Sequence, residues 1–306
     1  MNHPHDKLFK ATFSQPDVVA SLIEDLFPPA LVAGIDVQTL VLTTNSYIDN
    51  ELKEHFADLV YQCQFNNQAS FEIALLLEHK SYPDKHPHLQ LLRYMLNRWQ
   101  QDAQANEGLT PIVPVLIYHG ATRWPHRSLD AQMTKMQPEL RVYLPEFDYV
   151  LIDLSRLDDT QILNFRSQFL ALSTSLLKYH DQSKHVEFVR QHIMTMLSNV
   201  AEADLRAIIE PTFLYLLETS NLTGHEIVAI FSTVSKKTED AAMTAADQLR
   251  LEGRLEGRVE GRIETTYKFV KGALKLGMDA KTIASTFELD VKEVESIIAI
   301  LQQKKA

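Results

Sequence analysis

The sequence predicts a protein of the α/β class, in which a sheet covered by helices is followed by a mostly helical region and a helical tail. Two observations lead to this class. In residues 1–130, β-rich runs alternate with segments whose apolar residues recur at helical spacing, and from residue 131 onward helical spacing dominates. The composition is that of an ordinary globular protein, with 45% hydrophobic and 23% charged residues among 306.

The elements of the first segment follow from local patterns. A helix is expected to end at Phe27, where two prolines follow, and a hairpin is expected around the turn Asn66-Asn67-Gln68. A short apolar strand ends at Gly120. In chain order we expect a helix over 5–27, strands over 35–43, 55–65 and 70–80, a helix over 86–105, and a strand over 112–120. This order of helix, three strands, helix and strand describes one sheet with helical cover.

Three segments are expected: a core over 1–130, a helical region packed on it over 131–244, and an interaction segment over 245–306. The last contains three tandem Leu/Val-Glu-Gly-Arg tetrapeptides between Leu251 and Arg262. Their period of four lies close to the 3.6-residue helical turn, so their apolar residues form one slowly drifting stripe, although each glycine costs a helix about 1 kcal/mol. We interpret the repeat as a hinge or as a helix that packs against a partner, which favours a homo-oligomer.

Two short helices are expected after Gly277, with Asp279 and Asp290 at the positions of N-caps. This arrangement is similar to a helix-turn-helix, in which two short helices are joined by a tight turn. The segment is therefore expected either to contact DNA or to act as a small helical packing or dimerisation unit.

Composition excludes several classes of protein. The single cysteine, Cys63, excludes an intramolecular disulfide and a cysteine-based zinc site. No apolar run approaches the ~18 residues of a membrane-spanning helix, and the polar start is not that of a signal peptide. We therefore expect a cytoplasmic protein without membrane contact. The formal net charge of −10 argues against tight DNA binding by the first segment alone, where nine Lys and Arg face fifteen Asp and Glu.

Four polar residues stand on two neighbouring strands and on the helix after them: Asp58, Glu78, Lys80 and Gln90. Two converging carboxylates are the least that a hard divalent cation needs as oxygen ligands. Such a cation polarises a phosphoryl oxygen and lowers the pKa of an attacking water, and a nearby lysine can orient or deprotonate that water. The pattern is therefore typical of a metal-dependent nuclease, with the metal bound by Asp58 and Glu78 and the water assisted by Lys80.

Strand geometry gives this hypothesis a test. A three-residue loop between the second and third strands would pair Phe65 with Ala69. In that register Asp58 lies opposite Leu76 and diagonal to Glu78, close enough for the two carboxylates to share a metal. A two-residue turn would place Asp58 on the other face of the sheet unless a bulge intervened. The site therefore requires an odd-numbered loop or a bulge.

Supporting residues are expected on the two flanking helices. Tyr94 follows Gln90 by four residues and shares its helical face, with Arg93 beside it. Gln90 would anchor the site or its water, Arg93 would reach a phosphate, and Asp6 would approach from the first helix. The plainer interpretation of such residues is a solvated surface. Irregular spacing argues against a zinc site, so three histidines are interpreted as solvated: His79, His86 and His88.

Five runs occur in a fixed order along the chain: HDKLFKATFSQP, ADLVYQ, LLLEHKS, LQLLRYM and PVLIYHG. Taken together, they resemble the recombination-promoting nuclease (Rpn) family, which is also labelled a transposase family and belongs to the PD-(D/E)XK nuclease superfamily. The resemblance covers residues 3–240. It implies a restriction-endonuclease-like core and a magnesium-dependent DNA endonuclease that promotes recombination.

The resemblance also implies roles residue by residue. The first acid of the superfamily falls on Asp58, its Glu-x-Lys on Glu78 and Lys80, and its helical Gln-x-x-x-Tyr on Gln90 and Tyr94. In one departure, an alanine precedes the first acid where the superfamily label has a proline. Because that position varies widely in the superfamily, the departure counts more against the superfamily label than against the proposed chemistry.

The expected function is thus a DNA endonuclease that uses Mg²⁺, with Mn²⁺ or Ca²⁺ as possible substitutes, and whose partners are DNA and further copies of itself. Two alternatives are kept. The core could be catalytically idle, in a DNA-binding or regulatory protein, or the protein could be a transposase that joins strands. Metal-dependent cleavage that is lost on Asp58→Ala would separate the nuclease from the idle protein, and integrated products would identify a transposase.

Overall fold

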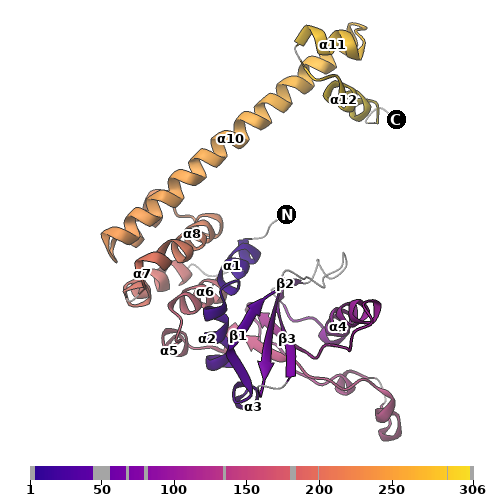
Figure 1. Cartoon of the computed structure of the whole chain (residues 1–306). Helices are drawn as coiled ribbons and strands as arrows, with labels where there is room; N and C mark the ends of the chain where they lie inside the picture. Colours follow the sequence, from indigo (N-terminus) through magenta and orange to yellow (C-terminus); the bar gives the residue numbers. More distant parts are fainter. Residues whose placement is uncertain are drawn as a thin grey trace. The chain divides into compact units, whose positions relative to one another are not determined.

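The computed structural model describes residues 4–43, 56–66, 69–78, 82–133, 136–179, 184–198, 200–287 and 289–303. The chain forms two compact units, residues 1–245 and 246–306. The first unit contains the sheet and the helices around it, and the second contains the C-terminal helices (Figure 1). Each unit has its own hydrophobic core.

The first unit is built on one five-stranded sheet whose strands follow the chain order. The first strand pairs with the second, and the second with the third, in antiparallel orientation, whereas the third pairs with the fourth, and the fourth with the fifth, in parallel orientation. The strands are β1 (Ile35–Leu42), β2 (Phe56–Phe65), β3 (Ala69–Glu78), β4 (Ile112–Tyr118) and β5 (Val150–Asp153). The expected mixed α/β fold is therefore confirmed at this level.

The fifth strand lies within the segment after residue 130 that was expected to be mostly helical, and it was not predicted. β5 is only four residues long, too short for strand periodicity to be recognised, and it is fixed by pairing with β4 from Val115↔Val150 to Tyr118↔Asp153. The boundary expected at residue 130 thus falls between two strands of one sheet.

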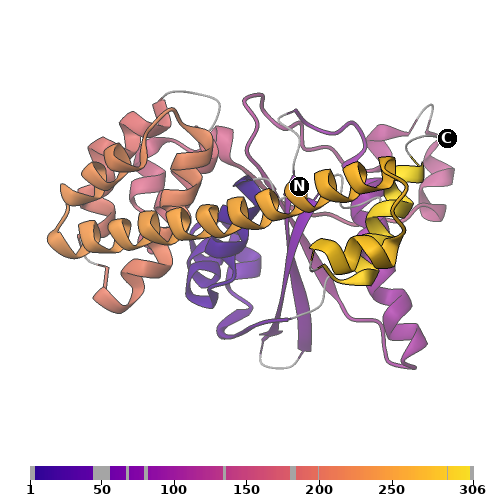
Figure 2. The same ribbon diagram turned by 90° about the horizontal axis from the view of Figure 1, so that it is seen from above.

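Helices cover both faces of the sheet. Figures 1 and 2 show α1 (Pro4–Phe13) and α2 (Pro16–Leu26) on one side and α4 (Pro87–Gln104) on the other, while α3 (Pro29–Val32) is a single turn before β1. The single helix expected over 5–27 is wrong, because the chain bends at Ser14 and Gln15 and a new helix starts with Pro16 at its first position. A proline fits the first turn of a helix but interrupts its interior.

A buried ionic network fixes α4 on the sheet. Arg98 of α4 donates from Nε to Glu72 Oε1 of β3 at 3.1 Å and from its terminal nitrogens to Asp102 and to Thr110 Oγ1. The side chains of Glu72 and Asp102 are fully buried. The Thr110 N–H closes the network by donating to Asp102 Oδ2 at 2.9 Å. Since buried charges are tolerated only when they are paired and hydrogen-bonded, this network sets the position of α4.

The region after β5 is helical, as expected. Its helix α6 is buried along almost its whole length and contacts α1, α5 and α7, with Thr12 Oγ1 of α1 donating to Ser173 Oγ at 2.7 Å. The elements between β4 and α10 are η2 (Asp130–Gln132), η3 (Pro138–Tyr143), η4 (Leu154–Arg156), α5 (Asp159–Leu163), α6 (Gln168–Lys178), α7 (Lys184–Leu197), α8 (Glu202–Thr219) and α9 (Gly224–Ser232).

The tandem tetrapeptides lie within one continuous helix, α10 (Lys236–Lys275), so the chain is helical rather than broken at these positions. The second unit continues with α11 (Ala280–Phe287) and α12 (Val291–Gln303). The two expected N-caps are present: Asp279 Oδ1 accepts the Thr282 N–H and Asp290 Oδ1 accepts the Lys292 N–H, each at 2.8 Å. Self-association and DNA contact by this segment stay predictions.

None of the helices in the described part of the chain is long and apolar enough to cross a membrane.

Candidate functional site

The register of β2 and β3 places the two expected metal-binding acids on one face of the sheet. Phe65 pairs with Ala69 across a three-residue loop, and Asp58 pairs with Leu76. Glu78 pairs with Phe56, so it lies two positions from Leu76 and diagonal to Asp58. Side chains two apart on a strand point to the same face, and such diagonal neighbours are about 7–8 Å apart. The predicted register is confirmed, while the side chain of Glu78 and all of Lys80 lie outside the described residues.

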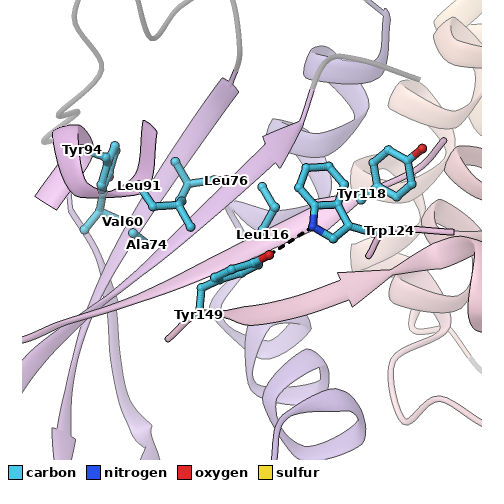
Figure 3. Packing of buried hydrophobic residues seen from close by; sticks show 9 residues of the cluster. All are labelled: Val60, Ala74, Leu76, Leu91, Tyr94, Leu116, Tyr118, Trp124 and Tyr149. Carbon is cyan, nitrogen blue, oxygen red and sulfur yellow. Dashed lines mark hydrogen bonds between the residues drawn. The ribbon is translucent and has the colours of Figure 1, made fainter. Parts of the chain in front are cut away.

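Tyr94 of α4 holds the first of these acids. Its hydroxyl donates to Asp58 Oδ2 at 3.1 Å, and Asp58 itself is half-buried. Figure 3 shows Tyr94 and Leu91 packed over Val60 and Ala74 of the sheet, in the cluster that forms its core on the α4 side. Because the tyrosine ring is fully buried, its hydroxyl has one orientation toward the acid. This hydrogen bond to Asp58 is a direct contact that supports the expected role of Tyr94 beside the site.

Gln90 is oriented by an acid that the sequence pattern did not single out. Its Nε2 donates to Asp84 Oδ2 at 3.1 Å, and Asp84 Oδ1 accepts the His86 N–H at 2.8 Å. An Asp that accepts the N–H two residues ahead, before a proline that opens a helix, is a common local turn. That signal at Asp84 could have identified the partner of Gln90. The catalytic role of Gln90 and the phosphate contact of Arg93 stay predictions.

The N-terminal helix reaches the end of β4. The ring centroid of His5 lies 4.9 Å from that of His119, and His5 Nδ1 lies 3.1 Å from the Tyr215 hydroxyl. Since β3 and β4 are parallel, with Leu77 beside Ile117, this end of β4 neighbours the end of β3 that carries Glu78. Asp6 follows His5 in the first turn of α1, and its participation in the site stays a prediction.

One of the three histidines interpreted as solvated is buried. His88 is 1% exposed, its Nδ1 lies 2.7 Å from Gln132 Nε2, and its ring packs edge-on against Tyr149. Burial, and secondarily the nearby His126, lower the pKa of His88. This correction has a non-local cause, because the segment that covers His88 comes from the β4–β5 connection. His86 is exposed, and His79 lies outside the described residues.

The donors on this face suit a hard divalent ion. Carboxylate oxygens are the ligands that Mg²⁺, Mn²⁺ and Ca²⁺ prefer, and Asp58 and Glu78 bring them from adjacent strands. Among the side chains that the structure describes, no three from His, Cys, Asp and Glu gather as a metal site, and the side chain of Glu78 is not among them. The fit therefore rests on the chemistry of the two acids and on their register.

Replacing Tyr94 with Phe should raise the metal concentration needed for half-maximal cleavage by about tenfold, because partners of metal-binding side chains typically contribute 10–100-fold to affinity or activity. The loss of one hydrogen bond should cost about 1 kcal/mol of stability. Cleavage rates measured over a Mg²⁺ titration test this. Tyr61→Phe is the matched control, since that buried hydroxyl donates to Phe13 O on the opposite face of the sheet. Equal metal requirements in both variants would contradict the role of Tyr94.

Comparison with known proteins links this chain to bacterial nucleases. It is 28% identical to the recombination-promoting nuclease RpnA of Escherichia coli (strain K12) over 252 residues, which cover 82% of this chain and 84% of RpnA. It is 27% identical to the recombination-promoting nuclease RpnC of the same strain, over 97% of this chain and 98% of RpnC. A third relative from that strain, 26% identical over 94% of both chains, is named "Inactive recombination-promoting nuclease-like protein RpnE".

No solved structure matches this chain. The relatives agree with the resemblance that the five sequence runs suggested, and they indicate a nuclease or recombination role in general terms. The family model described as "Putative transposase, YhgA-like" matches residues 3–206, and this protein belongs to that family.

Proposed function

We propose that this protein is a divalent-metal-dependent DNA endonuclease that hydrolyses phosphodiester bonds and thereby promotes recombination. The observation that carries the proposal is the register of β2 and β3, which puts Asp58 and Glu78 diagonally on one face, with the Tyr94 hydroxyl on Asp58. Two relatives over most of the chain are named recombination-promoting nucleases. We further propose that the sheet with α1 and α4 is a nuclease core of the PD-(D/E)XK type.

In this proposal the residues have distinct roles. Asp58 and Glu78 hold Mg²⁺, or Mn²⁺ or Ca²⁺ in its place. The bound ion supplies a polarised phosphoryl oxygen and a water of lowered pKa. Lys80 orients that water and offsets negative charge in the transition state. Gln90, held by Asp84, supports the water side of the site.

The supporting groups act through position rather than chemistry. Tyr94 fixes the Asp58 carboxylate from the side of α4. Arg93, one residue earlier on the half-buried face of the helix, contacts a DNA phosphate, and Asp6 approaches the edge of the sheet from α1. The rigid attachment of α4 through Arg98 keeps these groups in place, which matters because small displacements of a catalytic group cost large factors in rate.

Two alternatives stay open. A relative named inactive supports a catalytically idle protein that binds DNA or regulates another activity. The family description supports a transposase that joins strands. These alternatives predict different products from the same substrate: retained but intact DNA for the idle protein, and integrated products for the transposase.

The test is cleavage of supercoiled plasmid with Mg²⁺, Mn²⁺, Ca²⁺ or EDTA by the wild type and by Lys80→Ala. We expect nicking that requires metal and that falls by at least about 100-fold in the variant, since a general acid or base contributes 10²–10⁴-fold. Equal activity of wild type and variant would contradict the assignment of Lys80. DNA that is bound and left intact by the wild type in every metal would replace the nuclease with the DNA-binding alternative.

A further inference from the structure

The described cations of the first unit differ in whether an acid neutralises them. Several exposed Lys and Arg form ion pairs, such as Lys7 with Glu218, Arg166 with Asp25 and Lys237 with Glu202. Six exposed cations of the first unit form no ion pair within the described part of the chain. Lys10 and Arg190 lie on the helices α1 and α7. The other four, Lys85, Arg123, Arg127 and Arg156, are called here the edge cations, and they lie together in the fold.

All four edge cations follow the carboxyl ends of the three parallel strands. Lys85 lies in the connection after β3, Arg123 and Arg127 lie in the connection after β4, and Arg156 ends the 3₁₀ turn η4 directly after β5. In parallel strands these ends meet at one edge of the sheet. Glu78, the last residue of β3, stands at that same edge.

Hydrogen bonds tie these connections to one another. Trp124, next to Arg123, donates its N–H to Asp153 Oδ2 at 2.9 Å and its indole N–H to the Tyr149 hydroxyl at 3.1 Å (Figure 3). Gln132 reaches the connection after β3, with its Oε1 3.1 Å from His86 Nδ1. The edge cations are therefore carried on a continuous, anchored rim rather than on independent loops.

Two stretches of this rim contain no acid. The segments 85–101 and 119–129 contain no Asp or Glu, in a chain with a net charge of −10. Of the acids outside these stretches, Asp130 pairs with Arg141, whereas two accept hydrogen bonds that orient them but leave their charge: Asp84 from Gln90, and Asp153 from Trp124 and Ser155. Asp148 lies beside His126, which carries a positive charge only when it is protonated. Arg123 and Arg127 therefore stand in a segment that has no negative charge of its own, in an otherwise acidic protein.

We infer that the edge cations form the surface that holds the DNA backbone beside the nuclease site, an inference that rests on the proposed function. DNA is the occupant that fits, because a row of exposed, unneutralised cations is complementary to regularly spaced phosphates. Strands lie ~4.8 Å apart, so β5 stands about 14 Å from the strand of Asp58. Phosphates repeat every 3.4 Å along one strand of the duplex, so these cations contact phosphates several positions from the cleaved bond.

This placement separates binding from chemistry. Cations that contact distant phosphates should govern affinity and its salt dependence, without a preference among sequences. The triple variant Arg123→Gln/Arg127→Gln/Arg156→Gln should lower the slope of log affinity against log salt by about 3, at ~0.9 per phosphate contact. Its affinity for duplex DNA at 0.1 M salt should fall by about tenfold or more. Its thermal stability should stay near that of the wild type, because exposed substitutions usually change stability little.

The measurement is fluorescence anisotropy of a short labelled duplex over a KCl titration, with the full chain and Ca²⁺ in place of Mg²⁺. The matched control is Lys10→Gln/Arg190→Gln/Arg206→Gln, which removes the same charge from three exposed cations on α1, α7 and α8. Its salt slope should equal that of the wild type. Equal slopes in the two triple variants, or a wild type that does not bind duplex DNA, would overturn the inference.

Failure of this surface and failure of the nuclease can be told apart. If the Arg123/Arg127/Arg156 triple variant binds DNA normally and the wild type cleaves DNA with metal, the nuclease proposal stands and the DNA-binding role of the edge cations is wrong. If the triple variant has a lowered salt slope and the wild type never cleaves, the DNA-binding role stands and the nuclease proposal is wrong.

Discussion

Replacing Asp58 with Asn should lower metal-dependent DNA cleavage by at least roughly 100-fold while the protein stays folded. Partners of a metal ligand already contribute 10–100-fold, so a ligand itself should contribute no less. An amide oxygen can still accept the Tyr94 hydroxyl bond that Asp58 Oδ2 accepts at 3.1 Å, so the local packing is retained. What the substitution removes is the negative charge that a hard cation needs from its ligands. The readout is plasmid nicking at saturating Mg²⁺.

A matched control separates the loss of charge at the site from a general effect on the sheet. Asp36 lies on β1 of the same sheet, is also half-buried, and accepts the Gln38 N–H at 3.1 Å. Asp36→Asn should leave cleavage within about twofold of the wild type, in line with the small effects of most surface changes. Similar losses in the two variants, or full activity in Asp58→Asn, would remove Asp58 from the proposed metal site.

The part of the site that the sequence could predict is the part that depends on local geometry. The pairing of Asp58 with Leu76 follows from the length of one hairpin loop and the two-residue period of a strand. The helical caps at Asp279 and Asp290 likewise need only the residues next to them. The strand register and the helix caps each depend on a few neighbouring residues, so they could be predicted without knowledge of any tertiary contact.

The part that could not be predicted depends on segments that meet only in the folded chain. His88 is buried because Gln132 and Tyr149, from the β4–β5 connection, cover the start of α4. His5 meets Tyr215 across a sequence separation of 210 residues. The strand β5 is too short to stand out and is defined only by its pairing with β4. These contacts join segments that are distant in the sequence, so no local pattern of residues predicts them.

The same distinction applies to the acids and bases that position the helix. Glu72 sits in a strand of apolar residues, where a buried acid signals a partner, but nothing local identifies that partner as Arg98 on α4. The network therefore explains a feature that the site requires and that the sequence alone did not reveal. Tyr94 and Gln90 lie one and two turns before Arg98, so α4 positions both once this anchor is made.

Replacing Arg98 with Ala should destabilise the first unit by about 3–5 kcal/mol, the usual cost of leaving a buried charge without its partner. Glu72 and Asp102 would both lose their cation, and their side chains are fully buried. Arg98→Lys should be intermediate, because an ammonium keeps the charge but cannot donate in a planar fork to three partners. Urea unfolding followed by tryptophan fluorescence measures this change, since the chain has two tryptophans, Trp99 and Trp124, and both lie in the first unit.

The stability lost in Arg98→Ala should depend on pH in a direction that follows from the pKa of Asp102. Burial alone would raise the pKa of Asp102, but hydrogen bonds from Thr110 and the charge of Arg98 hold it below its ordinary value. A lowered native pKa contributes stability above the unfolded-state pKa of about 3.9, and the contribution is lost as the pH falls from there through the native value. The difference in unfolding free energy between wild type and Arg98→Ala should therefore be largest near neutral pH and shrink below about pH 4.

An exposed ion pair provides the control for the loss of an arginine in itself. Arg206 of α8 pairs with Glu210 one turn later at 3.4 Å, and both side chains are largely solvated. Arg206→Ala should change the unfolding free energy by less than about 1 kcal/mol, because solvent screens such pairs. A change of the same small size in Arg98→Ala would show that the network around Glu72 does not hold α4, and the positioning of Tyr94 on Asp58 would then need another cause.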